Sequence, residues 1–293
     1  MRINVCFRAL VMLTVLTSAS IGLASGGHGD PIPKKVGILL VAFGSSEASA
    51  QVSFENIDRK VKAAYPDIPV RWAYTSRIIR KKLAGQGRQL DSPAVALAKM
   101  QDEQFTHVAV QSLHTIGGAE YHDLQRIVEA FRHMGGFQRI IPGYPLMATQ
   151  KDMQRTVEAI LNAIPGKRKK NEAVVLMGHG THHPSNAFYA ALMFQLQLKD
   201  PNIFVGTVEG YPDVDLIRDM AIRKKIKTAY LIPFMSVAGD HAKNDMAGNG
   251  EDSWKSIFTK AGIHCIPILK GTAEFDEFVD IWVDHVGDSL SHF

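Results

Sequence analysis

The stretch Val36–Ser46, VGILLVAFGSS, is a continuous apolar run that ends in a glycine and two serines. A strand buried on both faces of a parallel sheet has this pattern, because helices cover both of its faces. The glycine and the serines predict a turn at the carboxyl end of the strand. In the second half of the chain, Ala173–Gly180, AVVLMGHG, has the same pattern. The two stretches predict that one α/β arrangement begins twice.

Apolar runs alternate with segments of helical spacing from Lys35 to the end of the chain. We predict strands at Val36–Phe43, Val70–Tyr74, His107–Leu113, Arg139–Pro142, Ala173–Met177, Ile203–Val208, Thr228–Pro233 and Cys265–Ile268. We predict helices at Val52–Ala64, Arg77–Leu83, Pro93–Met100, Tyr121–Phe131, Met153–Ile164, Ala187–Leu198, Val214–Ala221 and Phe275–Leu290, with a loop and a helix in Lys243–Lys260. This alternation predicts parallel sheets with helices on both faces.

The two halves resemble copies of one unit, as duplication produces. We align Gly44 with Gly178, and the third strands then end in the similar segments SLHTIGGAE (Ser112–Glu120) and PFMSVAGDH (Pro233–His241). We expect a first α/β domain at residues 34–146, a second at residues 147–270, and a closing helix in residues 271–293.

The composition is that of a folded and mildly basic protein. Of the 293 residues, 46% are hydrophobic and 21% are charged, which excludes a disordered chain. The 33 Lys and Arg residues and 29 Asp and Glu residues give a formal charge of +4, but basic residues gather only at Lys167–Lys170. Because a nucleic-acid partner requires basic residues along one face, we predict none.

The first 25 residues have the features of a secretory signal peptide. Arg2 and Arg8 precede the apolar run Leu10–Leu16, and small residues follow it. The run is shorter than the ~20 residues that cross a bilayer, so we expect cleavage rather than a membrane anchor. We predict a mature N-terminus between Ser25 and Asp30, a periplasmic location, and no membrane association after cleavage.

Three residues with metal-binding side chains follow three strands of the second half: His179, Glu209 and His241. Because the carboxyl ends of parallel strands meet at one edge of a sheet, we expect these side chains to converge. Two imidazoles and one carboxylate suit a divalent transition metal with open coordination positions. The corresponding positions of the first half are roughly Ser45, Ser76 and Glu120. We expect them to shape the opposite wall of the site.

Neighbouring polar residues leave alternatives open. A single histidine at a strand end is more often a hydrogen-bonded structural residue than a ligand. His182 and His183 lie in the loop after His179 and are alternative ligands or supports for the ligands. Arg77 begins the helix after the second strand, where backbone amides also attract anions, so it is a candidate for binding a polycarboxylate ligand.

Several longer segments resemble one enzyme family. They are VAVQSLHTIGGAEY, MGHGTHH, VEGYPDVD, LIPFMSVAGDHAKNDMAG and YTSRIIRKKL, and the similarity extends from about Val36 to Ile281. Through them the chain resembles the anaerobic sirohydrochlorin cobaltochelatases, the single-subunit class II chelatases of the cobalamin pathway. The resemblance implies two flavodoxin-like domains with the active site in the cleft between them, and a last helix that packs back on the first domain.

The resemblance also implies an activity and a ligand set. Members of this family insert Co2+ into the tetrapyrrole sirohydrochlorin, and the positions that match their metal ligands are His179, Glu209 and His241. These residues would hold the metal and accept the pyrrole protons, with Arg77 or Arg80 at the periphery of the macrocycle. Such a ligand set accepts Fe2+ as well as Co2+. The export signal leaves a second function open, a non-catalytic periplasmic carrier of a metal or of a tetrapyrrole such as haem.

His122 matches none of these positions and is expected at the exposed start of a helix. An exposed imidazole on an exported tetrapyrrole-handling protein is a candidate axial ligand of haem or a bridge to a second metal. In a symmetric homo-oligomer, two copies of such a residue can face each other across a two-fold axis. We therefore predict that any haem or second metal binds at a subunit interface that includes His122.

Overall fold

The computed structural model describes residues 32–293, so the predicted signal peptide and its cleavage site lie outside the described residues. The strands are β1 (Val36–Ala42), β2 (Val70–Tyr74), β3 (His107–Ser112), β4 (Arg139–Gly143), β5 (Ala173–Gly180), β6 (Ile203–Glu209), β7 (Thr228–Pro233) and β8 (His264–Pro267). The helices are α1 (Gln51–Ala64), α2 (Arg77–Ala84), α3 (Pro93–Asp102), α4 (Ala119–His133), α5 (Gln150–Ala163), α6 (Ala187–Lys199), α7 (Val214–Arg223), α8 (Trp254–Lys260) and α9 (Asp276–Leu290). A π-helical turn, Ala242–Met246, lies between β7 and α8. Within residues 32–293, no helix is both long and apolar enough to cross a membrane.

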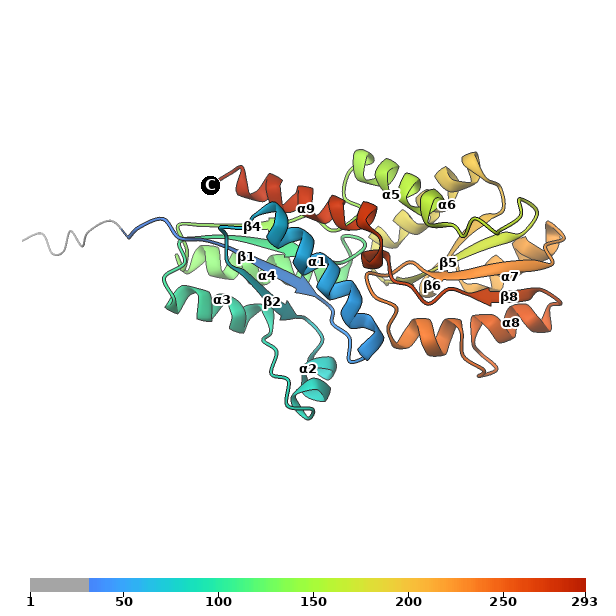
Figure 1. Ribbon diagram of the computed structural model, residues 1–293, viewed down its shortest axis with the longest axis horizontal. Coiled ribbons are helices and arrows are strands. Elements are labelled where there is room, and N and C mark those ends of the chain that lie inside the picture. The colour runs from blue at the N-terminus through green and yellow to red at the C-terminus, as the bar shows by residue number, and fades with distance from the viewer. Residues whose placement is uncertain (1–31) are drawn as a thin grey trace, which may run out of the picture. The chain divides into compact units, whose positions relative to one another are not determined.

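The strands form two four-stranded parallel sheets with the same strand order (Figure 1). The order is β2-β1-β3-β4 in the first sheet and β6-β5-β7-β8 in the second. The strands β1 and β5 therefore lie inside their sheets, as their continuous apolar sequences predicted. The predicted fold class, parallel sheets flanked by helices, is confirmed.

The structure aligns β1 with β5 two residues away from the alignment that we predicted for the two halves. The β1–β3 and β5–β7 ladders make Gly44 the counterpart of Gly180, not of the glycine two residues earlier. Gly44 and Gly180 also share a positive φ, of 101° and 85°, as turn glycines do. His179 therefore corresponds to Phe43 rather than to Ser45. The predicted alignment was wrong because the segment GHG offers two glycines, and a two-residue shift keeps every side chain on the same face of the strand.

Alternating side chains of the strands pack against helices on both faces of each sheet. In the first sheet, α1 and α9 cover one face, and α3 and α4 cover the other. In the second sheet, α5 and α6 cover one face, and α7 and α8 cover the other. The alternation is clear in β1, where Ile38, Leu40 and Ala42 pack with α1 and α9, whereas Leu39 and Val41 pack with α3 and α4.

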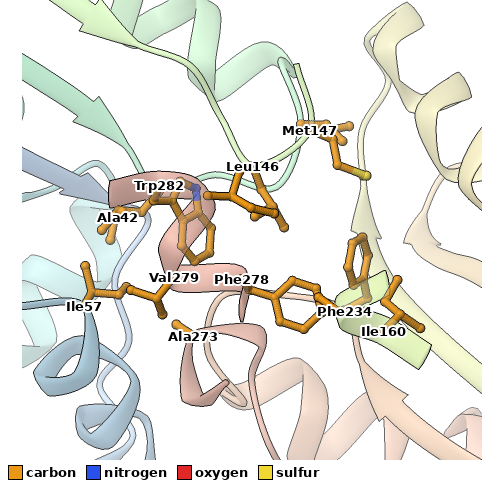
Figure 2. Close-up of a cluster of buried hydrophobic side chains, with 14 of the residues drawn as sticks. Ala42, Ile57, Leu146, Met147, Ile160, Phe234, Ala273, Phe278, Val279 and Trp282 are labelled. Atoms are coloured by element: carbon orange, nitrogen blue, oxygen red, sulfur yellow. The ribbon is translucent and has the colours of Figure 1, made fainter. Parts of the chain in front are cut away.

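One hydrophobic cluster extends from the first sheet to the second through α9 (Figure 2). Phe278 and Trp282 of α9 are buried in it. The ring centroid of Phe278 lies 6.4 Å from that of Phe234, which directly follows β7. On the side of the first sheet, Ala42 and Ile57 belong to the same cluster. The last helix of the chain therefore gives the two sheets a shared core.

A buried ion pair fixes α9 against α5. Nε2 of His285 lies 3.1 Å from Oδ1 of Asp152, and its Nδ1 lies 3.1 Å from the carbonyl oxygen of Tyr144. Both partners of the ring are acceptors, so a proton on either ring nitrogen can be donated to one of them. Burial alone would raise the pKa of Asp152, but hydrogen bonds from Thr149 and the charge of His285 outweigh burial and lower the pKa.

We expect His285→Ala to lower the free energy of unfolding by about 3–5 kcal/mol, because the Asp152 carboxylate is then buried without its counter-charge. The loss is measured as a lower midpoint of urea unfolding at neutral pH. Since folding lowers the pKa of Asp152, its contribution is complete above the pKa of the unfolded aspartate and is lost as the pH falls toward the folded value. The control is His264→Ala, at an exposed histidine that begins β8. Equal midpoints for the two variants would contradict a stabilising ion pair.

Candidate functional site

A cavity of about 600 Å³ lies at the carboxyl ends of the strands, lined by residues that follow both sheets. The second sheet contributes the three predicted metal ligands, His179, Glu209 and His241. The first sheet contributes the predicted opposite wall, Ser45, Ser76 and Glu120. A volume of this size is typical of small-molecule sites. The strand ends of both sheets therefore present polar side chains to one shared space.

The imidazole rings of His179 and His241 are in edge-to-face contact, with centroids 4.9 Å apart and planes at 85°. Nδ1 of His179 donates a hydrogen bond to the carbonyl oxygen of Gly180 at 3.0 Å. Nδ1 of His241 donates to Oδ2 of Asp245 at 2.5 Å. In a neutral imidazole, a proton on Nδ1 leaves Nε2 with a free lone pair, which is the form that binds a metal.

Asp245 is a residue to which the sequence interpretation gave no role. It lies in the π-helical turn, four residues after His241. A carboxylate that accepts from the second nitrogen of a histidine fixes the ring orientation and raises the basicity of the first nitrogen. The spacing of four residues was a usable signal, because such residues share a face of a helix. The contact was not recognised, because residues 243–260 were predicted only as a loop and a helix without defined bounds.

Glu209 reaches the cavity because the ends of β5 and β6 approach each other closely. Gly180 pairs with Glu209 in the ladder, and a Cβ at Gly180 would lie 2.2 Å from the carbonyl oxygen of Glu209. Glu209 itself is exposed. Among the described residues, no group of three or more His, Cys, Asp and Glu side chains is arranged to hold a metal ion. The structure thus pairs the two histidines and places Glu209 on the lining of the same cavity.

The opposite wall carries a second histidine–carboxylate pair that the sequence interpretation did not include. Nε2 of His114 lies 3.4 Å from Oε2 of Glu120, and Nδ1 of His114 contacts Oγ of Ser112 at 2.8 Å. Burial alone would raise the pKa of Glu120, but the hydrogen bond and charge of His114, with the charge of His179, lower it. Glu120 is therefore held in its carboxylate form, facing the cavity.

The helix α2 lies at the edge of the cavity, where arginines were predicted to bind carboxylates. Its side chains on the cavity lining are those of Ile78, Ile79 and Lys82, not those of Arg77 and Arg80. Arg77 is exposed at the first turn of α2. The structure therefore places both arginines on the helix that borders the cavity, but outside its lining.

His122 lies in a separate hollow of about 590 Å³, which His182 and His183 also line. The ring centroids of His122 and His183 are 4.7 Å apart. Nδ1 of His122 contacts Oε1 of Gln125 at 2.8 Å. His122 is half-buried rather than fully exposed as predicted, because these neighbours cover one side of its ring. Of the two loop histidines, His182 lines both spaces, whereas His183 lines only this hollow.

Comparison with known proteins places the fold and the cavity in context. Residues 36–291 match the family described as "Cobalt chelatase (CbiK)". The chain belongs to the cobalt chelatase family. This chelatase is 46% identical over 261 residues to "Sirohydrochlorin cobaltochelatase CbiKC" of Nitratidesulfovibrio vulgaris, which covers 89% of this chain and 92% of the relative. It is 36% identical over 259 residues to "Sirohydrochlorin cobaltochelatase" of Salmonella typhimurium, and the alignment covers 88% of this chain and 97% of the relative.

Two solved structures share the fold of the chelatase. "SirB from Bacillus subtilis with Fe3+" superposes with a TM-score of 0.61 at 17% identity, covering 87% of this chain and 95% of that one. "CbiX, the terminal Enzyme for Biosynthesis of Siroheme in Denitrifying Bacteria" superposes with a TM-score of 0.55 at 15% identity, covering 86% and 98%. The predicted family and the predicted enzyme class, a metal chelatase, are confirmed by the family match and the two relatives.

We expect Gly180→Ala to lower the free energy of unfolding by about 1–3 kcal/mol, because its φ of 85° is strained for alanine and the new methyl group meets the Glu209 carbonyl. Urea unfolding measures the change. The matched control is Gly166→Ala, since no atom lies within 4 Å of a Cβ at Gly166 and its φ is ordinary. If Gly180→Ala proved as stable as the control, the close approach of β5 and β6 would be disproved.

Proposed function

We propose that the protein inserts Co2+ into sirohydrochlorin, with the metal ion and the macrocycle as its two substrates. The observation that carries the proposal is the contact between His179 and His241 in the cavity, in a chain of the cobalt chelatase family. Both relatives named above are sirohydrochlorin cobaltochelatases. Fe2+ is the alternative metal, because imidazole and carboxylate ligands bind both ions.

In this proposal, Nε2 of His179 and Nε2 of His241 bind the incoming ion, and the carboxylate of Glu209 is the third ligand. The hydrogen bonds from the two Nδ1 atoms hold the rings in the tautomer that this role requires. Glu209 also balances the charge of the ion. An exposed carboxylate suits an ion that must first lose water and later leave the protein. Arg77 and Arg80, on the bordering helix, are proposed to contact acid groups at the outer edge of the macrocycle.

The same imidazoles are proposed to accept the pyrrole protons. As the nitrogen atoms of the macrocycle replace the protein ligands, each Nε2 lone pair is freed. The freed lone pairs of His179 and His241 can then take the protons that the macrocycle must lose. With a reference pKa near ~6.5, an imidazole can act as a ligand and as a proton acceptor near neutral pH. Ligand loss and proton transfer are thereby coupled at the same atom.

We expect His179→Ala and His241→Ala each to abolish insertion of Co2+ without unfolding the protein, because each removes one Nε2 ligand. Asp245→Asn should reduce turnover by about 10- to 100-fold, since it weakens the orientation and basicity of His241. Turnover is followed by the visible spectrum of the macrocycle, and folding by circular dichroism. Asp252→Asn, an exposed aspartate of the same loop, is the control. Wild-type turnover in either histidine variant would remove that residue from the ligand set.

The alternative function is a non-catalytic carrier of a metal or a tetrapyrrole. Anaerobic incubation of the purified protein with sirohydrochlorin and Co2+ separates the two functions. An enzyme converts many equivalents of the macrocycle, with the spectral change of metal insertion. A carrier binds one equivalent and converts no further macrocycle.

We further propose that the protein is exported and periplasmic. The support is the charge and hydropathy pattern of the N-terminal segment, with Arg2 and Arg8 before Leu10–Leu16. We expect N-terminal sequencing of the protein isolated from its own cells to begin between Ser25 and Asp30. A chain that begins at the initiator methionine would rule out cleavage.

A second ligand site is proposed at His122. The supporting observation is the hollow of about 590 Å³ in which His122, His182 and His183 gather outside the main cavity. We propose that any haem or second metal binds there, at an interface between copies of the chain. Haem titration of the wild type and of His122→Ala should give different Soret spectra or affinities. Identical titrations, or no haem binding by either protein, would eliminate this site and leave the chelatase proposal unchanged.

A further inference from the structure

An ion pair joins segments that follow the two different sheets: Glu47 is on the cavity lining, and its partner Lys243 lies just outside that lining. Nζ of Lys243 lies 2.5 Å from Oε2 of Glu47. Glu47 belongs to the loop after β1, and Lys243 belongs to the π-helical turn after β7. Both side chains are partly exposed, at 38% for Lys243 and 25% for Glu47. Because partly exposed ion pairs contribute little to stability, replacing one carboxylate by another in this pair is nearly neutral in free energy.

A second lysine stands near the same carboxylate. Lys82 of α2 lines the cavity together with Glu47. The pKa of Glu47 is lowered by the hydrogen bond and charge of Lys243 and also by the charge of Lys82. The loop is held in place, since the backbone N–H of Glu47 donates to Oγ of Ser45 at 3.1 Å. The carboxylate of Glu47 is therefore bonded to one cation, Lys243, and is influenced by the charge of a second, Lys82.

The charges on the cavity lining are unfavourable for an acidic ligand. The acidic residues of the lining are Glu47, Glu120, Glu209 and Asp240, whereas Lys82 is its one lysine or arginine, beside four histidines. Sirohydrochlorin, the substrate of the proposed function, is a polycarboxylate. Its acid groups need cations, and the ammonium group of Lys243 is already occupied by Glu47. Exchange of partners would add the positive charge of Lys243 to that of the two arginines proposed to contact the macrocycle.

We propose that Glu47 occupies the position of a substrate carboxylate in the empty protein, and that an acid group of the macrocycle displaces it to bind between Lys243 and Lys82. This inference rests on the proposed function for the identity of the macrocycle. Glu47 then acts as an internal competitor that sets the specificity of the site for acidic tetrapyrroles. If the ion pair only held the two segments together, replacing Glu47 and replacing Lys243 would change the Kd of the macrocycle in the same direction. In an exchange, the two replacements change the Kd in opposite directions.

The test measures binding of sirohydrochlorin, without metal, by the change in its visible spectrum. Glu47→Gln should lower the Kd by about three- to tenfold, and Lys243→Met and Lys82→Met should each raise it by a similar factor. In a protein that already carries Lys243→Met, Glu47→Gln should change the Kd by less than half as much as it does in the wild type. Asp240→Asn is the matched control, because it removes a carboxylate of the lining that is hydrogen-bonded to Asn244 rather than to a lysine. Its effect should be less than half that of Glu47→Gln.

A second probe is the macrocycle with its acid groups converted to neutral amides, whose Kd should not respond to any of these variants. Changes of the same sign for Glu47→Gln and Lys243→Met, or an equal effect of Asp240→Asn, would overturn the exchange. Variants that shift the Kd as expected in a protein that inserts no Co2+ would uphold the exchange and reject the proposed function. Insertion of Co2+ by a protein whose variants leave the Kd unchanged would uphold the proposed function and reject the exchange. Absence of macrocycle binding by the wild type would reject the exchange and the proposed function.

Discussion

The burial of α9 between the two sheets is the interaction on which the rest of the structure depends. Each sheet has a hydrophobic layer of its own on one face, and these two layers do not touch the other sheet. The third cluster, around Phe278 and Trp282, includes side chains from both sheets. Apolar burial supplies its stability but not its direction. The hydrogen bonds of His285 to Asp152 and Tyr144 supply direction, because rotation or sliding of α9 would break them.

The packing of α9 against both sheets also sets the dimensions of the cavity. Its two walls belong to different sheets, and its polar residues follow separate strands whose backbones are fixed by their neighbours. Side chains on such rigid elements keep their positions better than side chains on free loops. As the proposed ligand set, two imidazoles and one carboxylate would also leave coordination positions of the ion open. An enzyme that must release its ion into another molecule has more use for such an arrangement than for a closed site.

Most of the fold could be predicted from the sequence, because long apolar strands and helical spacing are local signals. The strand-end rule also brought His179, Glu209 and His241 to one cavity without any knowledge of the loops between them. The supporting residues could not be found in this way. Asp245 is indicated by its spacing of four residues from His241 and not by a strand end, and the pair of His114 and Glu120 depends on the path of a loop.

The two proposed imidazole ligands have unequal hydrogen-bond partners. His179 is supported by the carbonyl oxygen of the next residue, whereas His241 is supported by a carboxylate. A carboxylate partner makes the imidazole a stronger electron donor than a neutral carbonyl does. In the proposed mechanism, the bond from His179 to the ion would therefore be the weaker one and would break first. The ion would swing toward the macrocycle while still tethered to His241, so delivery would be a hinged transfer with a fixed order of release rather than a simultaneous detachment.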